Sequence, residues 1–150
     1  MIRRQAIALL ALVGLLVATY LWLYKIGVVG ELKCGTESCE YVQASPYAEL
    51  FGVPVAFYGV VGYGALLALG LASVSRRGAG DRRVTLLLVT LATLGFAFTL
   101  YLTGIELFVL HAICRWCVAS ALIMTTIWTL ALVDRPRSAT AGSEPPVPPS

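Results

Sequence analysis

The sequence predicts an all-α integral membrane protein, a bundle of four helices that each cross the bilayer. Hydrophobic residues make up 59% of the 150-residue chain and charged residues only 13%, which is about half the charged share of an average soluble domain. The hydrophobic residues fall in four long blocks, each close to the ~20 residues that a helix needs to cross the hydrocarbon. The blocks cover residues 5–24, 53–74, 84–103 and 113–133. They are too long and too uniformly apolar for the strands of a membrane barrel, which alternate over ~10 residues.

The first block follows Arg3 and Arg4, an arrangement that a cleavable signal peptide would share. Its apolar stretch runs for about 20 residues, longer than the apolar region of most signal peptides, and no A-x-A-like cleavage site precedes Lys25. We therefore expect an uncleaved first helix. The net charge of +3 gives no indication of a nucleic-acid partner, because the arginines stand in pairs at predicted helix ends, where orienting charges belong.

Lysine and arginine residues are divided unequally between the two sides of the predicted bundle. Eight lie on one side, namely Arg3, Arg4, Arg76, Arg77, Arg82, Arg83, Arg135 and Arg137. Three lie on the other, namely Lys25, Lys33 and Arg115. The side rich in positive charge is normally cytoplasmic, so we expect both termini in the cytoplasm. The four cysteines are then expected on the extracytoplasmic face of the cytoplasmic membrane, where disulfides persist.

Two segments outside the blocks have signatures of their own. In the loop 25–52, Ser45 has the residue type of a helix N-cap and Pro46 that of a first helical position, while Gly52 and Pro54 would end the helix. This pattern predicts a short helix on the extracytoplasmic membrane surface. Residues 135–150 are rich in Ser and Pro and predict a disordered cytoplasmic tail, which leaves residues 1–134 as the membrane domain.

The sharpest chemical motif is Cys114-Arg115-Trp116-Cys117, at the start of the fourth block. Residues three apart share a helix face, so the two sulfurs can approach each other and form a disulfide. A helix N-terminus also carries partial positive charge, which favours a thiolate. The alternative is that both cysteines are small buried hydrophobic residues, but a C-x-x-C at a membrane boundary favours redox chemistry.

A second pair, Cys34 and Cys39, lies in the loop after the first helix with four residues between the cysteines. Taken alone, this pair is compatible with a structural disulfide, and all four cysteines together could hold zinc. We expect no metal, because structural zinc stabilises soluble folds, whereas lipid supports this one. A loop pair together with a helix-start pair instead indicates a thiol–disulfide relay, since exchange requires a thiolate to reach a disulfide sulfur.

The order of these motifs resembles that of bacterial vitamin K epoxide reductase homologues, over about residues 5–133. It comprises the loop cysteine pair, then Ser-Pro-Tyr-Ala (45–48) and Phe-Gly-Val-Pro (51–54), then a helix with Phe-Tyr-Gly and Tyr-Gly, and finally the C-x-x-C that opens the fourth helix. Other members carry a fused thioredoxin-like domain, which this chain lacks. The resemblance therefore implies a separate partner, a DsbA-like protein with a thioredoxin fold.

The resemblance implies a four-helix bundle around a membrane quinone of the menaquinone, ubiquinone or vitamin K type. Cys114 and Cys117 would be the active pair, with Cys117 facing the quinone. Cys34 and Cys39 would be the shuttle, in which Cys34 exchanges with Cys114 and Cys39 is attacked by the partner. The implied activity is that of a membrane thiol:quinone oxidoreductase, which reoxidises its partner for disulfide bond formation.

Several other residues have both a structural and a functional interpretation. Ser45 matches a serine near the family's site and is equally a helix cap. Trp116 is a candidate for packing on the quinone ring, although it also fits the aromatic belt at a membrane interface. His111 is expected to be solvated at the membrane interface rather than to have a catalytic proton role, and Glu106 to be a solvated or snorkelling boundary residue rather than a quinone ligand. Glycines of the second helix are expected to permit close helix packing; these are Gly59, Gly62 and Gly64.

Three other functions fit parts of the pattern. A DsbB-like oxidase also couples thiols to quinone in four helices, but its C-x-x-C belongs to the first extracytoplasmic loop, whereas this one belongs to the second. A membrane scaffold or assembly protein would use both cysteine pairs as structural disulfides. An electron importer would run the same relay in reverse.

Overall fold

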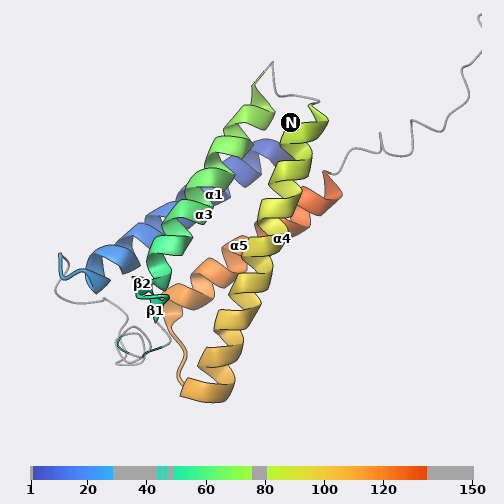
Figure 1. The fold of residues 1–150 in the computed structure, drawn as a ribbon. Coiled ribbons are helices and arrows are strands. Elements are labelled where there is room, and N and C mark those ends of the chain that lie inside the picture. The colour runs from blue at the N-terminus through green and yellow to red at the C-terminus, as the bar shows by residue number, and fades with distance from the viewer. Residues whose placement is uncertain (1, 29–43, 45, 47–48, 76–80, 135–150) are drawn as a thin grey trace, which may run out of the picture.

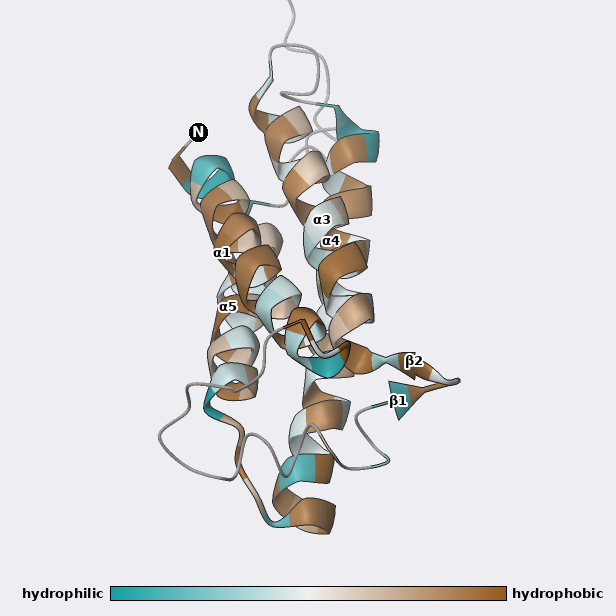
Figure 2. Ribbon diagram, turned by 90° about the vertical axis from the view of Figure 1, so that its left-hand side faces the viewer, coloured by the Kyte–Doolittle hydropathy of each residue, from teal (hydrophilic) through white to brown (hydrophobic). Residues whose placement is uncertain are grey.

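The described helices form a four-helix bundle (Figure 1). The computed structural model describes residues 2–28, 44, 46, 49–75 and 81–134. The helices are α1 (Ile2–Lys25), α3 (Val55–Val74), α4 (Arg82–Gly104) and α5 (Arg115–Val133). Each lies in a span long and apolar enough to cross a membrane, and Figure 2 shows hydrophobic residues along much of their length. The four membrane-spanning helices predicted from the sequence are confirmed.

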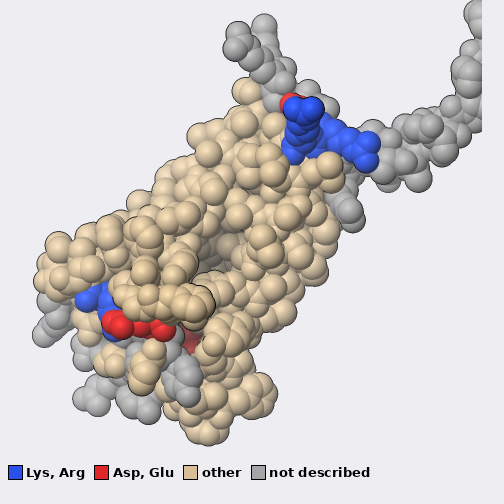
Figure 3. Space-filling model, viewed as in Figure 1, with Lys and Arg blue, Asp and Glu red and all other residues tan. Residues whose placement is uncertain are grey.

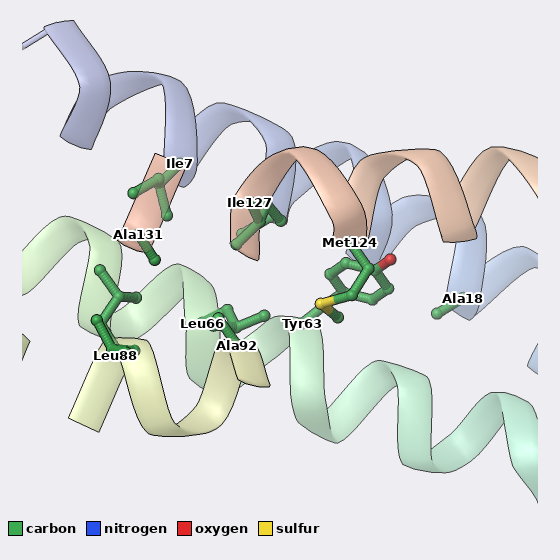
Figure 4. Close-up of a cluster of buried hydrophobic side chains, with 11 residues drawn as sticks. Ile7, Ala18, Tyr63, Leu66, Leu88, Ala92, Met124, Ile127 and Ala131 are labelled. Carbon is green, nitrogen blue, oxygen red and sulfur yellow. The ribbon is translucent and has the colours of Figure 1, made fainter. Parts of the chain in front are cut away.

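The helices pack in a ring in which each has two main neighbours. α1 packs most extensively on α3 and also on α5, while α4 packs on α5 and α3. Apolar side chains from all four helices meet inside the bundle (Figure 4). Among them, Ile7 of α1, Leu66 of α3, Ala92 of α4 and Ile127 of α5 are almost completely buried. Because lipid is as apolar as these side chains, close packing is what draws such helices together.

Gly14 of α1 lies directly against Tyr63 of α3. A Cβ at position 14 would overlap the Tyr63 ring, which is buried. The ring is held in place because its hydroxyl donates a hydrogen bond to the Ser120 carbonyl oxygen of α5, at 2.9 Å. The missing side chain at Gly14 therefore allows a single tyrosine to join three helices.

The glycines of α3 differ in what surrounds them. At Gly59 an added Cβ would lie 3.2 Å from the Cβ of Ala18, so the prediction of close packing is confirmed there. At Gly62 and Gly64 no atom lies within 4 Å of the added Cβ, and for these two the prediction was wrong. Successive residues turn by about 100° around a helix, so the three glycines point in different directions.

Arg4 joins three helices at one end of the bundle. Its Nε donates to Oδ2 of Asp134 at 2.8 Å, and its Nη1 donates to the carbonyl oxygen of Ser73 at 3.0 Å. These bonds join the first turn of α1 to the C-terminal ends of α3 and α5. At the opposite end, Lys25 pairs with Glu49 at 3.6 Å. Figure 3 shows charged side chains at the two ends of the bundle and an uncharged surface between them.

A small antiparallel hairpin precedes α3, with strands β1 (Glu49–Leu50) and β2 (Val53–Pro54). It projects from the side of the bundle in Figure 2. Its turn residues Phe51 and Gly52 have φ angles of 54° and 76°, the positive values that a type I′ hairpin turn requires at both positions. The predicted surface helix was therefore wrong over residues 49–54, because Gly52 supports a tight reversal here instead of a helix end.

We expect Gly14→Ala to destabilise the bundle, because the new methyl group must displace the buried Tyr63 ring or part α1 from α3. Overpacking of this kind costs about 1–3 kcal/mol, enough to lower the unfolding temperature of the purified protein in detergent. Gly64→Ala is the matched control, since its methyl group enters open space. Equal thermal stability of the two variants would contradict the packing of Tyr63 against Gly14.

Candidate functional site

The Cys-x-x-Cys motif lies where α5 begins, at the end of the bundle opposite the Arg4 contacts. Cys114 is the N-cap residue, with an extended backbone (φ −88°, ψ 119°), and its carbonyl oxygen accepts the Val118 N–H at 2.9 Å. Cys117 lies in the first helical turn. No disulfide joins Cys114 and Cys117 in this structure; Cys114 is completely buried and Cys117 is half-buried. The prediction that this motif opens the fourth helix is confirmed.

The chain reaches this motif through an irregular segment that continues α4. Residues Ile105–Leu110 form a π-helical turn, a geometry often found at functional sites. His111 ends the turn in the left-handed conformation, with a φ of 50°. The N–H groups of His111 and Ala112 both donate to the Glu106 carbonyl oxygen, the second at 3.1 Å. The helical path therefore runs further than the block ending at residue 103 predicted.

This turn brings the Glu106 side chain into the bundle, where it is only 7% exposed. Its Oε2 accepts the backbone N–H of Cys114 at 3.3 Å. The Cys117 thiol is within hydrogen-bonding reach of both this carboxylate and the Cys114 sulfur. The expectation that Glu106 is a solvated boundary residue was wrong, because the π-helical turn carries it past the predicted helix end and inward. His111, by contrast, is exposed as expected.

A cavity of about 150 Å³ lies beside the motif, within the ring of helices. Figure 3 shows a hollow in the uncharged surface of the bundle. Most of the cavity wall is apolar. Of the two motif cysteines, Cys117 lines the cavity and Cys114 does not. The other polar side chains that line it are Glu106, Tyr58, Tyr63, Ser120, Thr99 and Thr103.

The space in this cavity arises from small residues on the inner faces of the helices. Gly62 lines it, and a Cβ there would meet no atom within 4 Å, so this glycine borders open space. Gly95 lines it as well, but a Cβ there would lie 2.8 Å from Cε of Met124, so the cavity is narrower at that point. An apolar cavity of about 150 Å³ is large enough for a single six-membered ring.

Trp116 packs away from this cavity. Its ring contacts Tyr20, with ring centroids 5.0 Å apart, in a cluster that includes Leu21 and Cys114. It is not among the residues that line the cavity. Its Nε1 is buried and has no hydrogen-bond partner within the described part of the chain. The structure thus brings Cys114 and Cys117 together but does not bring Trp116 to the cavity.

The pKa of the Cys114 thiol is lowered from its ordinary value. The main cause is a hydrogen bond from the Cys117 thiol, which stabilises a thiolate on Cys114. Burial opposes this shift, as does the negative charge of Glu106, while the N–H groups of Cys117 and Trp116 add to it. The start of α5 therefore favours negative charge on Cys114, as expected for a cysteine at a helix N-terminus.

Three predicted site residues, Cys34, Cys39 and Ser45, lie outside the residues that the structure describes, and their roles stay predictions. Within the described ranges, no three His, Cys, Asp or Glu side chains are grouped so that they could hold a metal ion. A zinc site built from four cysteines would need the two that are not described.

The sequence reasoning missed the polar groups of the cavity. Tyr63 and Ser120 share a hydrogen bond of 2.9 Å between their hydroxyls, across α3 and α5. Nothing in the local sequence marks Ser120 as part of a site. The sequence does give one indication that Glu106 belongs to the site, because it is an acidic residue beside an apolar block and eight positions before Cys114. Ionisable residues in membrane segments usually mark functional sites.

Comparison with known proteins covers nearly the whole described bundle. The model of the vitamin K epoxide reductase family matches residues 5–132. The match therefore includes the π-helical turn, the Cys-x-x-Cys motif and nearly all of each helix. No curated protein matches the chain.

We expect Cys114 to ionise at a lower pH than an ordinary cysteine. In Cys117→Ala its pKa should rise, because the thiol that donates a hydrogen bond to the Cys114 sulfur is missing. The measurement is the ultraviolet absorbance of the thiolate as a function of pH, in a background where Cys34 and Cys39 are both alanine. Cys114→Ala in that background supplies the baseline. An identical Cys114 midpoint with and without Cys117 would show that Cys117 does not stabilise the thiolate.

Proposed function

The chain belongs to the vitamin K epoxide reductase family and is an integral membrane oxidoreductase, and from this premise we propose that it is a quinone-dependent protein-dithiol oxidoreductase. In this proposal it takes electrons from a separate DsbA-like partner with a thioredoxin fold. It passes them to a membrane quinone of the menaquinone, ubiquinone or vitamin K type. The observation that carries the proposal is that Cys117, one of two contacting thiols, lines an apolar cavity inside a membrane bundle.

The residues around the cavity fit a quinone ring. The apolar wall suits the ring itself, and the cavity has room for at least one six-membered ring. The hydroxyl groups of Tyr63 and Ser120 place polar atoms at the same wall, and we propose that Ser45 adds another. When bound, the quinone supplies the redox chemistry by accepting two electrons and two protons.

We propose that electrons enter through the Cys34–Cys39 disulfide, which a partner thiolate opens by attack on Cys39. The freed Cys34 thiolate attacks Cys114 of the Cys114–Cys117 disulfide, and Cys117 leaves as a thiolate at the cavity wall. Once the partner's second thiol has released Cys39, that thiolate attacks Cys34, restores the loop disulfide and releases Cys114. The lowered pKa of Cys114 suits this step, because a thiol of low pKa leaves faster.

We also propose that the cysteine end faces the extracytoplasmic side of the cytoplasmic membrane. The support is the distribution of charge in the bundle, since Arg3 and Arg4 of α1 and Arg82 and Arg83 of α4 lie at the end away from the cysteines. Positive charge of this kind favours the cytoplasmic side. The other side is a compartment where disulfides persist.

Quinone reduction by the purified protein in detergent, followed by quinone absorbance, tests this function. With dithiothreitol as donor we expect Cys117→Ala to abolish the reaction, because the thiol at the cavity wall is lost. Cys34→Ala and Cys39→Ala should keep a slow reaction with dithiothreitol, which reaches the Cys114–Cys117 pair directly. Both should lose the reaction with a reduced thioredoxin-fold donor.

Equal loss in all cysteine variants with dithiothreitol would contradict the division into a shuttle and an active pair. If the redox state of the cysteines does not respond to quinone at all, the pairs are structural disulfides, and a membrane scaffold explains the chain better.

The cavity can be tested separately from the cysteines. We expect Gly62→Leu to raise the KM for quinone by about tenfold, equivalent to ~1.4 kcal/mol, because the new side chain fills open space in the cavity. Gly64→Leu is the matched control, since its side chain also enters open space but Gly64 does not line the cavity. An unchanged KM in Gly62→Leu would place the quinone elsewhere.

A further inference from the structure

Glu106 occupies a position that the proposed relay does not use. Its carboxyl group is buried in the bundle and lines the cavity together with Cys117. We propose that Glu106 is the proton carrier of this site, taking the proton of the Cys117 thiol and passing it to an oxygen of the quinone ring. This inference rests on the proposed function and deepens it.

The contacts of Glu106 are those that a proton carrier between a thiol and a ligand requires. The Cys117 thiol is within hydrogen-bonding reach of its carboxylate. The Cys114 N–H, at 3.3 Å from Oε2, orients the carboxyl group toward the motif. A proton acceptor must lie within hydrogen-bonding reach of the proton that it takes, and Glu106 meets this condition while also bordering the space where a ring would bind.

The hydrogen bond to the Cys114 N–H does not by itself require an ionisable group at this place, because a neutral amide oxygen accepts it as well. A buried charge is unfavourable unless an opposite charge pairs with it. Among the basic residues that the structure describes at this end, Lys25 pairs with Glu49 and Arg115 is exposed. Glu106 has thiols and a backbone N–H as its neighbours instead. An ionisable side chain of this kind in a membrane protein indicates a functional group.

The proposed step balances in electrons and protons. Oxidation of the two thiols to a disulfide releases two electrons and two protons, and reduction of a quinone to a quinol takes up both. Cys117 leaves the disulfide as a thiolate and is protonated to the thiol until a quinone binds; it then gives this proton to Glu106, and the thiolate so formed is the electron donor at the cavity wall. The Cys114 sulfur attacks Cys117 and closes the S–S bond as the electron pair passes to the ring. Glu106 delivers this proton to one ring oxygen, and the other ring oxygen takes up a proton from water, which replaces the one that Cys114 released when it ionised.

Glu106 also holds the backbone of Cys114, so a positioning role must be separated from proton transfer. A glutamine at this position keeps an oxygen for the Cys114 N–H but cannot take up a proton at neutral pH, so the two roles differ in their pH dependence. Titratable and charged groups near this carboxyl come from the motif, the cavity wall and the exposed surface; they are Cys114, Cys117, Tyr58, Tyr63, His111 and Arg115.

The experiment is a single turnover of the reduced full-length protein in detergent with menadione, a naphthoquinone. For Glu106→Gln we expect a rate slower on the order of 100-fold at neutral pH, the size of a general acid–base contribution. A carboxyl group that is already protonated cannot take the Cys117 proton, so the wild-type rate should fall as the pH is lowered and the difference from Glu106→Gln should shrink. Glu106→Asp, which keeps a carboxylate, should recover part of the rate. Glu49→Gln is the matched control, the same substitution at an exposed carboxylate of this end.

Reduction of the Cys114–Cys117 disulfide by dithiothreitol shows whether the site is intact in each variant. Intact disulfide reduction in Glu106→Gln together with a pH-dependent defect toward menadione supports proton transfer. A wild-type rate in Glu106→Gln, an equal defect at every pH, or a Glu106→Asp rate as low as that of Glu106→Gln would overturn it. If the wild type itself does not reduce menadione, the proposed function fails, and this inference fails with it.

Discussion

The hydrocarbon of a bilayer contains no water, so each backbone N–H and C=O within it needs a partner in the protein. Regular helices meet this requirement along the bundle, but the chain leaves regular geometry between the end of α4 and the start of α5. There Glu106 supplies the partners, since its carbonyl oxygen accepts from His111 and Ala112 and its carboxylate accepts from Cys114. The residue that supplies these hydrogen-bond partners therefore also lies beside Cys114 and Cys117.

Close packing and open space are divided between different parts of the ring. Tyr63 contacts Gly14 and Ser120 and so joins α1, α3 and α5, whereas Gly62 of α3 borders empty volume. Cys117 lies between packed and open regions, because it belongs to the first turn of α5 and also lines the cavity. Its partner Cys114 is turned away from that cavity and carries the lowered pKa. The two sulfurs thus have different surroundings, which suits the proposed thiol exchange at Cys114 and the proposed electron transfer at Cys117.

The residue pattern was sufficient to predict the four spanning helices and the position of Cys114 and Cys117 at a helix start. Hydrophobic length and helix capping are properties of contiguous residues, so a single sequence carries them. The burial of Glu106 depends on how far the third spanning helix continues, because a few more helical residues turn a side chain from the surface to the interior. The hairpin at residues 49–54 likewise depends on where the predicted surface helix ends. The open space at Gly62 depends on what the other helices leave empty, which no single segment specifies.

The bond between Arg4 and Asp134 has a consequence for biogenesis. It connects residues 130 positions apart, so it forms only after nearly the whole chain has been synthesised and inserted. The extensive α1–α3 contact joins the first two membrane-spanning helices of the described chain and can form while α5 is still on the ribosome. Because Cys114 caps α5 and Cys117 lies in its first turn, the proposed active pair joins the bundle last. A nascent chain thus packs its first two spanning helices together before the proposed redox centre is complete.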